Sequence, residues 1–101
     1  MAIDDSSFAT LADQFLERIA DAVEDAMADA DADLQAGILT ITLPGRGQYV
    51  INKHAPNREI WLSSPKSGAH HFACRDGVWV STRDSGVVLP ELLRAELGVE
   101  V

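Results

Sequence analysis

The first quarter of the chain carries apolar residues at a helical spacing. From about Ser7 to Met27 these residues recur three and four positions apart, which places them on one face of an α-helix. Just ahead of this pattern, Asp5, Ser6 and Ser7 are candidate N-caps, because their side-chain oxygens can accept free backbone N–H groups. We therefore predict an amphipathic helix with an apolar stripe formed by Phe8, Leu11, Phe15, Ile19, Ala22, Val23 and Ala26.

After this helix the apolar spacing changes to two, which is typical of β-strands. Asp29, Asp31 and Asp33 alternate with apolar residues, so a strand here presents three carboxylates on one side. Because aspartate is a poor strand former, we expect this strand at an edge of the sheet. The pair Asp76-Gly77 predicts a tight hairpin. The predicted strands are residues 29–34, 39–43, 48–52, 59–63, 70–75 and 78–81.

A second helical pattern follows the strands, from Val87 to Leu97. Pro90 is tolerated in a first turn, and Gly98 is a typical stop. The links between the predicted strands are shorter than the dozen or so residues of a parallel crossover, so the strands must be mainly antiparallel. We predict an α+β fold: a two-layer α-β sandwich, with two helices packed on one face of an antiparallel sheet, in a single domain over residues 1–101.

Charge is distributed unevenly along the 101 residues. The net charge is −8, and residues 1–33 alone hold ten acids and one base. Such a field repels nucleic acid and anionic membranes and attracts cations or a basic protein surface. One cysteine excludes an internal disulfide framework, and the chain has neither an apolar stretch of about 20 residues nor a recognisable leader. We therefore expect a cytoplasmic protein that binds neither nucleic acid nor membrane.

The acidic residues of the first third form a ridge with two interpretations. The first is a solvated helix face, and the second is a binding surface for something positive. Like charges four residues apart destabilise a helix by about 0.2–0.5 kcal/mol per pair, and Arg18 is the only base within the helix to relieve them. We name this set the acidic ridge and treat its members as candidate metal ligands: Asp13, Glu17, Asp21, Glu24, Asp25, Asp29, Asp31 and Asp33.

The ligand type limits which metal the ridge can bind. Carboxylate oxygens suit Mg²⁺, Ca²⁺, Mn²⁺ or iron, and no His or Cys is placed to enclose a tight zinc or copper site. We therefore expect weak, multiple and poorly selective surface binding. A basic protein partner is the other occupant that fits, and its docking would be sensitive to salt.

Two tryptophans differ in their predicted environment. Alternation turns Ile60 and Leu62 toward the core and therefore Trp61 outward, where an indole is a candidate interface anchor. The alternative is a register shifted by one residue, which would turn Trp61 inward. Trp79, beside the Asp-Gly turn, is expected in the core. His70 and His71 face opposite sides of a strand and cannot share one metal ion. We find no catalytic triad, phosphate loop or metal-binding motif, so catalysis is poorly supported.

The stretch YVINKHAPNREIWLSSPKSG, residues 49–68, resembles the frataxin family. LADQFLERIADAVED (11–25) is similar to the acidic first helix of that family, and GILTITL (37–43) to an early strand. DGVW (76–79) resembles its tryptophan-bearing hairpin, and LPELLRAEL (89–97) its closing helix. The resemblance extends over nearly the whole chain and implies the same α-β sandwich, as in a bacterial member.

The resemblance also implies a role in iron–sulfur cluster assembly. Members bind cysteine desulfurase, and some bind the iron–sulfur scaffold protein. Ferrous or ferric iron binding by the ridge is a family property, and the matching carboxylates here are Asp21, Glu24, Asp25, Asp29, Asp31 and Asp33. The partner-facing sheet surface of the family carries over to Asn52, Lys53 and Trp61. His71 stands where some members have a basic residue, and Cys74 stands at a nearby position that is aromatic in the family.

Three functional hypotheses remain open from the sequence. The first is a non-catalytic, iron-binding adaptor that regulates cysteine desulfurase and acts mostly as a monomer. The second is a ferroxidase, or an iron-storage or iron-chaperone protein, which would need a defined oxidation site and iron-dependent oligomers. The third is an acidic α+β domain with no such role, for which the specific sheet motif leaves little room.

Overall fold

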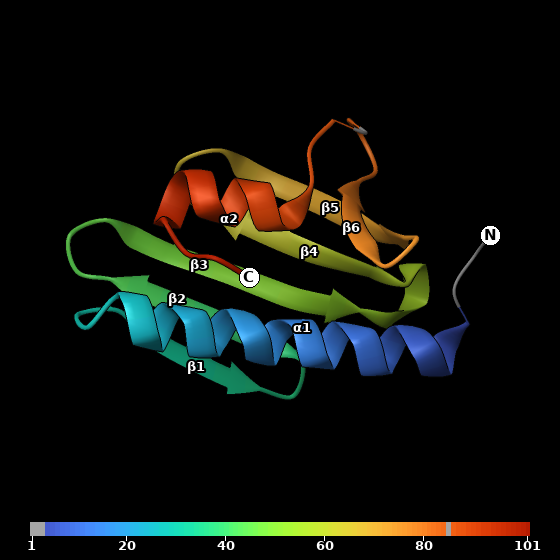
Figure 1. The fold of residues 1–101 in the computed structure, drawn as a ribbon, viewed down its shortest axis with the longest axis horizontal. Helices are drawn as coiled ribbons and strands as arrows, with labels where there is room; N and C mark the ends of the chain where they lie inside the picture. Colours follow the sequence, from blue (N-terminus) through green and yellow to red (C-terminus); the bar gives the residue numbers. More distant parts are fainter. Residues whose placement is uncertain (1–3, 85) are drawn as a thin grey trace.

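The computed structural model describes residues 4–84 and 86–101. Six strands form one antiparallel sheet in the order β1-β2-β3-β4-β5-β6, and both helices lie on the same face of it (Figure 1). The predicted α+β sandwich is therefore confirmed. The elements are α1 (Asp5–Ala26), β1 (Asp31–Gln35), β2 (Ile38–Leu43), β3 (Gly47–His54), a 3₁₀ turn (Ala55–Asn57), β4 (Glu59–Ser64), β5 (Gly68–Arg75), β6 (Val78–Ser81) and α2 (Leu89–Leu97).

Helix α1 begins one residue earlier than the predicted caps allow. Asp4 is the N-cap, and its Oδ1 accepts the backbone N–H of Ser7 at 2.7 Å. The predicted caps Asp5, Ser6 and Ser7 are therefore wrong, because all three are already helical. The hydrogen bonds from Ser7 hold the pKa of the Asp4 carboxyl below its usual range.

The face of α1 that packs on the sheet is rotated from the predicted stripe. Leu16 and Ala12 are completely buried, whereas Leu11 is 39% exposed and Ala26 is exposed. The prediction was therefore wrong for Leu11 and Ala26. It was right for Phe8, Phe15, Ile19 and Val23, which are all buried. Spacings of three and four fit more than one set of neighbouring helix positions. The contact with the sheet decides which set is buried.

Alternation along the strands separates the two faces of the sheet. Every second residue of β2–β6 points to the helices, and these residues form the sheet side of the core. Trp79 is only 3% exposed, as predicted, and its ring makes an edge-to-face contact with Phe8 at a centroid distance of 6.0 Å. Asp76 and Gly77 both have positive φ angles, 52° and 80°, as a tight two-residue hairpin requires.

Helix α2 begins at Leu89, two residues later than predicted. Val88 is its N-cap residue and pairs with Val80 as an extended bridge, so this part of the predicted helix continues the edge of the sheet instead. Pro90 lies in the first turn and Gly98 ends the helix in the left-handed conformation, as expected. Neither helix in the described residues is long and apolar enough to cross a membrane.

The carboxylate of Glu96, in the last turn of α2, connects this helix to the sheet. Its Oε1 accepts hydrogen bonds from the hydroxyl of Tyr49 at 2.8 Å and from Oγ of Ser64 at 2.6 Å. Its Oε2 accepts one from Oγ of Ser67 at 2.6 Å. Burial raises the pKa of the Glu96 carboxyl, but the hydrogen bonds from Ser64, Ser67 and Tyr49 outweigh burial and leave that pKa below its usual range.

Tyr49, the only tyrosine, allows this cluster to be tested at high pH. Burial, together with the hydrogen bond to Glu96, raises the pKa of its hydroxyl to about 12. The stabilisation is complete below the ordinary tyrosine pKa of about 10 and is lost as the pH rises through the folded value. We expect the free energy of unfolding, measured with urea, to fall between about pH 10 and pH 12 in the wild type. In Tyr49→Phe the free energy of unfolding should fall less over the same pH range. An equal fall in the two proteins would contradict this prediction.

Candidate functional site

The acidic ridge begins on the flank of α1 that faces the end of β1 and β2. Asp13 and Glu17 line an open hollow there, together with Leu34, Gly37 and Lys53. The ammonium of Lys53 lies 2.9 Å from Oδ1 of Asp13 and forms an ion pair with it. This end of the ridge is therefore partly neutralised by a base that reaches across from β3.

Farther along α1 the ridge carries no such compensation. Asp21, Glu24 and Asp25 are exposed, and among the described residues Asp13 is the only ridge member in an ion pair. The one base of α1, Arg18, lies against the ring of Phe15 instead, with its guanidinium carbon 5.7 Å from the ring centroid. Three adjacent carboxylates near the negative end of the helix dipole therefore leave a strongly negative surface.

The carboxylates of β1 lie on a different surface from those of α1. Asp31 and Asp33 pair with Thr42 and Thr40 on the sheet face opposite the helices, while Leu34 points toward α1. As predicted, β1 is an edge strand. The prediction was wrong for Asp29, because this residue precedes the strand in a turn. The ridge thus runs around an edge of the molecule.

This arrangement does not bring the carboxylates to one point. Within residues 4–84 and 86–101, no three His, Cys, Asp or Glu side chains are grouped closely enough to hold one metal ion. The eight predicted ligands are all exposed and supply oxygen atoms of the hard type, but they are spread over the flank of α1, the turn before β1 and the outer face of β1. Such a surface attracts cations and basic protein surfaces without a preformed coordination cage.

On the sheet face opposite the helices, Trp61 lies in a stack of three rings. The ring of His54, from β3, is 3.6 Å from it and that of His71, from β5, is 4.2 Å, with interplanar angles of 9° and 10°. The indole N–H donates to Oε1 of Glu59 at 2.8 Å. Trp61 points outward as predicted, since Ile60 and Leu62 on either side of it are buried. We call His54, Trp61 and His71 the ring stack.

Of the other predicted partner-binding residues, Asn52 joins this surface and Lys53 does not. Asn52 pairs directly with Trp61 across β3 and β4 and shares its side of the sheet. Lys53 points to the helix side, where it pairs with Asp13. The prediction that both belong to one sheet surface was wrong, because adjacent residues of a strand face opposite ways.

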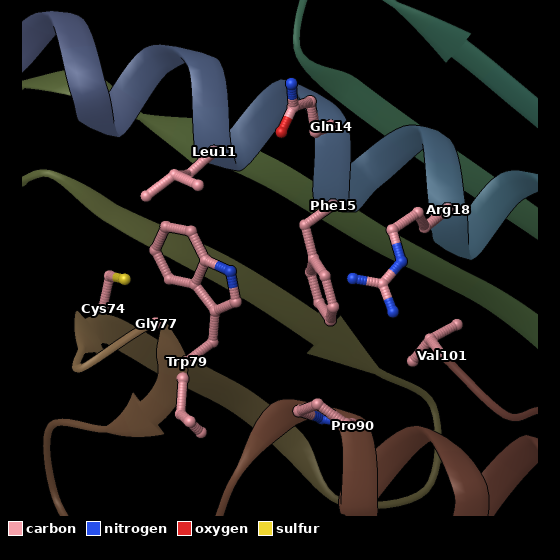
Figure 2. A pocket seen from close by; sticks show the side chains of 10 residues that line it. Leu11, Gln14, Phe15, Arg18, Cys74, Gly77, Trp79, Pro90 and Val101 are labelled. Carbon is pink, nitrogen blue, oxygen red and sulfur yellow. The ribbon is translucent and has the colours of Figure 1, made fainter.

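His70 and Cys74 lie on the helix side of β5, as alternation requires. Nε2 of His70 is 2.8 Å from Oγ of Ser67, at the margin of the Glu96 cluster. Cys74 borders a hollow of about 200 Å³ between the two helices, which Trp79 and Phe15 also line (Figure 2). Cys74 therefore packs beside the core, on the opposite face of the sheet from the ring stack.

Comparison with known proteins agrees with this geometry. The sequence matches the model of a frataxin-like domain over residues 1–101. The chain belongs to the frataxin family. It is 41% identical over 91 residues to the mitochondrial frataxin homolog of Saccharomyces cerevisiae, covering 85% of this chain and 52% of that protein, so it spans about half the length of this relative. It is 36% identical over 100 residues to the iron-sulfur cluster assembly protein CyaY of Neisseria meningitidis, covering 96% and 92%.

Solved frataxins share the fold. The frataxin of Psychromonas ingrahamii superimposes with a TM-score of 0.79 at 26% identity and covers 98% of this chain and 96% of its own. A trimeric yeast frataxin complexed with ferrous iron superimposes with a TM-score of 0.78 at 34% identity, covering 97% and 86%. The two-helix, antiparallel-sheet architecture of this frataxin-family chain is therefore shown by sequence and by structure.

Two residues of the outer sheet surface were missed by the sequence analysis. His54 and Glu59 contact Trp61 directly, yet neither was among the predicted partner-binding residues. Alternation alone indicates both, because each lies two residues from a predicted surface position, Asn52 or Trp61. The stacking itself could not be foreseen, since it depends on how three strands are aligned.

Proposed function

We propose that this frataxin-family protein is a non-catalytic adaptor and regulator of iron–sulfur cluster assembly. In this proposal the exposed carboxylates of α1 dock on a basic surface of cysteine desulfurase. The outer sheet surface around Trp61 binds the same assembly, including its scaffold protein. The observation that carries the proposal is the uncompensated negative surface formed by Asp21, Glu24 and Asp25. The role of the CyaY relatives, given in their name, supports the pathway, and their bacterial sources support a cytoplasmic location.

Iron enters this proposal as cargo or effector bound weakly at the ridge. Hard carboxylate oxygens suit Fe²⁺ and Fe³⁺, and their open arrangement favours several weak sites over one tight site. The ferrous complex of yeast frataxin supports an association of the family with iron. Binding to the native state alone would stabilise it by RT ln(1 + L/Kd), where L is the free ligand concentration, so the melting temperature would rise once L exceeds Kd.

A ferroxidase or iron-storage role is the second candidate. The trimeric state of yeast frataxin, including its ferrous complex, favours it, because storage requires assembly. Against it, ferroxidation needs closely placed ligands, and the described residues contain no group of three. Oxidation of ferrous iron by this protein at a rate well above that of buffer, together with iron-dependent oligomers, would favour storage over the adaptor role.

A charge reversal at the ridge tests the adaptor role. Glu24→Lys with Asp25→Lys places positive charge near the C-terminus of α1, where the helix dipole favours it, so the variant should fold. Glu91→Lys with Glu100→Lys is the matched control, because it changes the net charge equally at two exposed positions outside the ridge. We expect the ridge variant to bind cysteine desulfurase about tenfold or more weakly, with the control near the wild type.

The readouts are Kd at low and moderate salt and desulfurase turnover, each with and without ferrous iron. Loss of salt-sensitive binding and of the change in turnover in the ridge variant alone supports the proposal. The sign of the wild-type effect then distinguishes activation from inhibition. Wild-type affinity in the ridge variant, or equal losses in both variants, would overturn docking through this surface.

A further inference from the structure

The ring stack determines how Trp61 can meet a partner. Both faces of the indole are covered, by His54 at 3.6 Å and by His71 at 4.2 Å, and its N–H is bonded to Glu59. The indole therefore has one conformation before any partner binds, and only its edge and the imidazole edges beside it remain available. Such a prearranged aromatic anchor reduces the entropy that docking must overcome.

Protonation of the two imidazoles would change this surface more than any other titration near neutral pH. Imidazole is the side chain that changes charge between pH 5 and pH 8. The two histidines lie on either side of Trp61, so the stack carries between zero and two positive charges. Glu59 is the carboxylate beside it, and directly opposes His54 across β3 and β4.

Several other charges lie around the stack. On the outer face, β1 contributes Asp31 and Asp33, β2 contributes Ile38 and Thr40, β3 contributes Asn52, and β6 contributes Val78 and Val80. Arg83 and Asp84, which follow β6, line the same hollow as His71. From β5 the same face presents Ala69, Ala73 and Arg75. Arg58, at the turn before β4, forms an ion pair with Asp5. Because imidazole is the side chain that changes charge between pH 5 and pH 8, the two histidines are the part of this surface whose charge can vary in that range.

The environment of His54 indicates in which protonation state its ring stacks on Trp61. Its Nδ1 is buried and, among the described residues, has no hydrogen-bond partner. A neutral imidazole can leave this nitrogen without a proton, whereas the imidazolium carries an N–H on both nitrogens. Protonation thus places a buried donor where no acceptor lies, a cost that is relieved when the ring moves out of the stack.

We propose that His54 and His71 are positioning residues for Trp61, and that the stack holds Trp61 in its docking conformation only while His54 is neutral, which makes docking at the outer sheet surface dependent on pH. The proposal rests on the proposed function for its partner, cysteine desulfurase. At lower pH the stack opens, and Trp61 is no longer held in its docking conformation. The affinity then falls although the ridge carboxylates remain ionised.

Fluorescence of the protein alone tests the stack without any partner. We expect the wild-type tryptophan emission to change between pH 8 and pH 5.5, where imidazoles titrate. Trp61→Phe should remove the change, which leaves buried Trp79 as a constant background. The change should also be absent in His54→Phe with His71→Phe, which keeps aromatic stacking without a titrating group. His70→Gln is the control, because His70 lies on the helix side of β5. A wild-type emission independent of pH would overturn the proposal.

Binding of cysteine desulfurase at pH 6 and pH 8 tests the consequence. We expect about fivefold weaker binding by the wild type at pH 6, and affinity independent of pH in the double phenylalanine variant. His54→Gln with His71→Gln should bind weakly at both pH values, since stacking is lost. Equal wild-type binding at both pH values would overturn this inference and leave the adaptor role intact. If the wild type binds at neither pH, the adaptor role is overturned. The fluorescence of the protein alone then still shows whether the stack responds to protonation.

Discussion

Replacing Leu16 by alanine is expected to lower the free energy of unfolding by about 2–5 kcal/mol. Leu16 is completely buried between α1 and the sheet, so the substitution removes apolar contacts and leaves a cavity. Leu11, on the same helix, is 39% exposed at the edge of the hollow between the helices. Leu11→Ala should therefore cost less than about 1 kcal/mol, as surface substitutions usually do.

Urea unfolding followed by far-ultraviolet circular dichroism would measure both variants. The pair is matched in chemistry and in helix, so a difference in helix propensity cannot explain a difference in stability. Equal losses in the two variants, or a larger loss for Leu11→Ala, would mean that α1 packs with the face predicted by the simple three-and-four spacing. That outcome would contradict the rotation described above.

Glu96→Gln is expected to cost about 1–3 kcal/mol at neutral pH, because the substitution takes away acceptor capacity from three hydroxyl groups. The glutamine amide keeps one acceptor oxygen. Its NH₂ group is a donor and faces a hydroxyl that donates to Glu96 in the wild type, so two donors would face each other. Glu100→Gln is the control, since Glu100 is exposed near the same end of α2 and its substitution should change stability by no more than about 0.5 kcal/mol.

The same pair of variants tests the pKa of Glu96. Since this pKa is held below its usual range in the folded protein, its contribution is present above the ordinary glutamate value, about 4.5, and is lost as the pH falls through the folded value. The stability difference between the wild type and Glu96→Gln should therefore shrink below about pH 4.5. A difference that stays constant down to pH 3 would show that shape alone, and not the charge of Glu96, holds the cluster.

Local patterns were sufficient for the type and order of the elements. Alternation placed Ile60 and Leu62 inside and Trp61 outside, and the Asp76-Gly77 pair located the hairpin that brings Trp79 into the core. These features depend on residues within a few positions of one another, and the backbone geometry of strands and tight turns allows few alternatives. The resemblance of residues 49–68 to frataxins then indicated the whole α-β sandwich.

The sequence predicted less well which face of a helix or strand each side chain lies on. Leu11 and Leu16 both suit an apolar stripe, and only the contact with the sheet buries Leu16 and leaves Leu11 partly exposed. Asn52 and Lys53 were assigned to one surface from a motif, although strand geometry separates them. Strand alternation alone predicts that Asn52 and Lys53 face opposite sides of the sheet, whereas the resemblance to the family motif places them together.

The sequence by itself determined the α+β architecture, the segregation of negative charge into the first third of the chain and the outward position of Trp61. The tertiary structure alone decided the contacts between distant residues: Lys53 with Asp13, Tyr49 with Glu96, and the stacking of His54 and His71 on Trp61. The first two pairs are separated by 40 and 47 residues. Such contacts depend on strand register and on where each helix crosses the sheet, which no local spacing specifies.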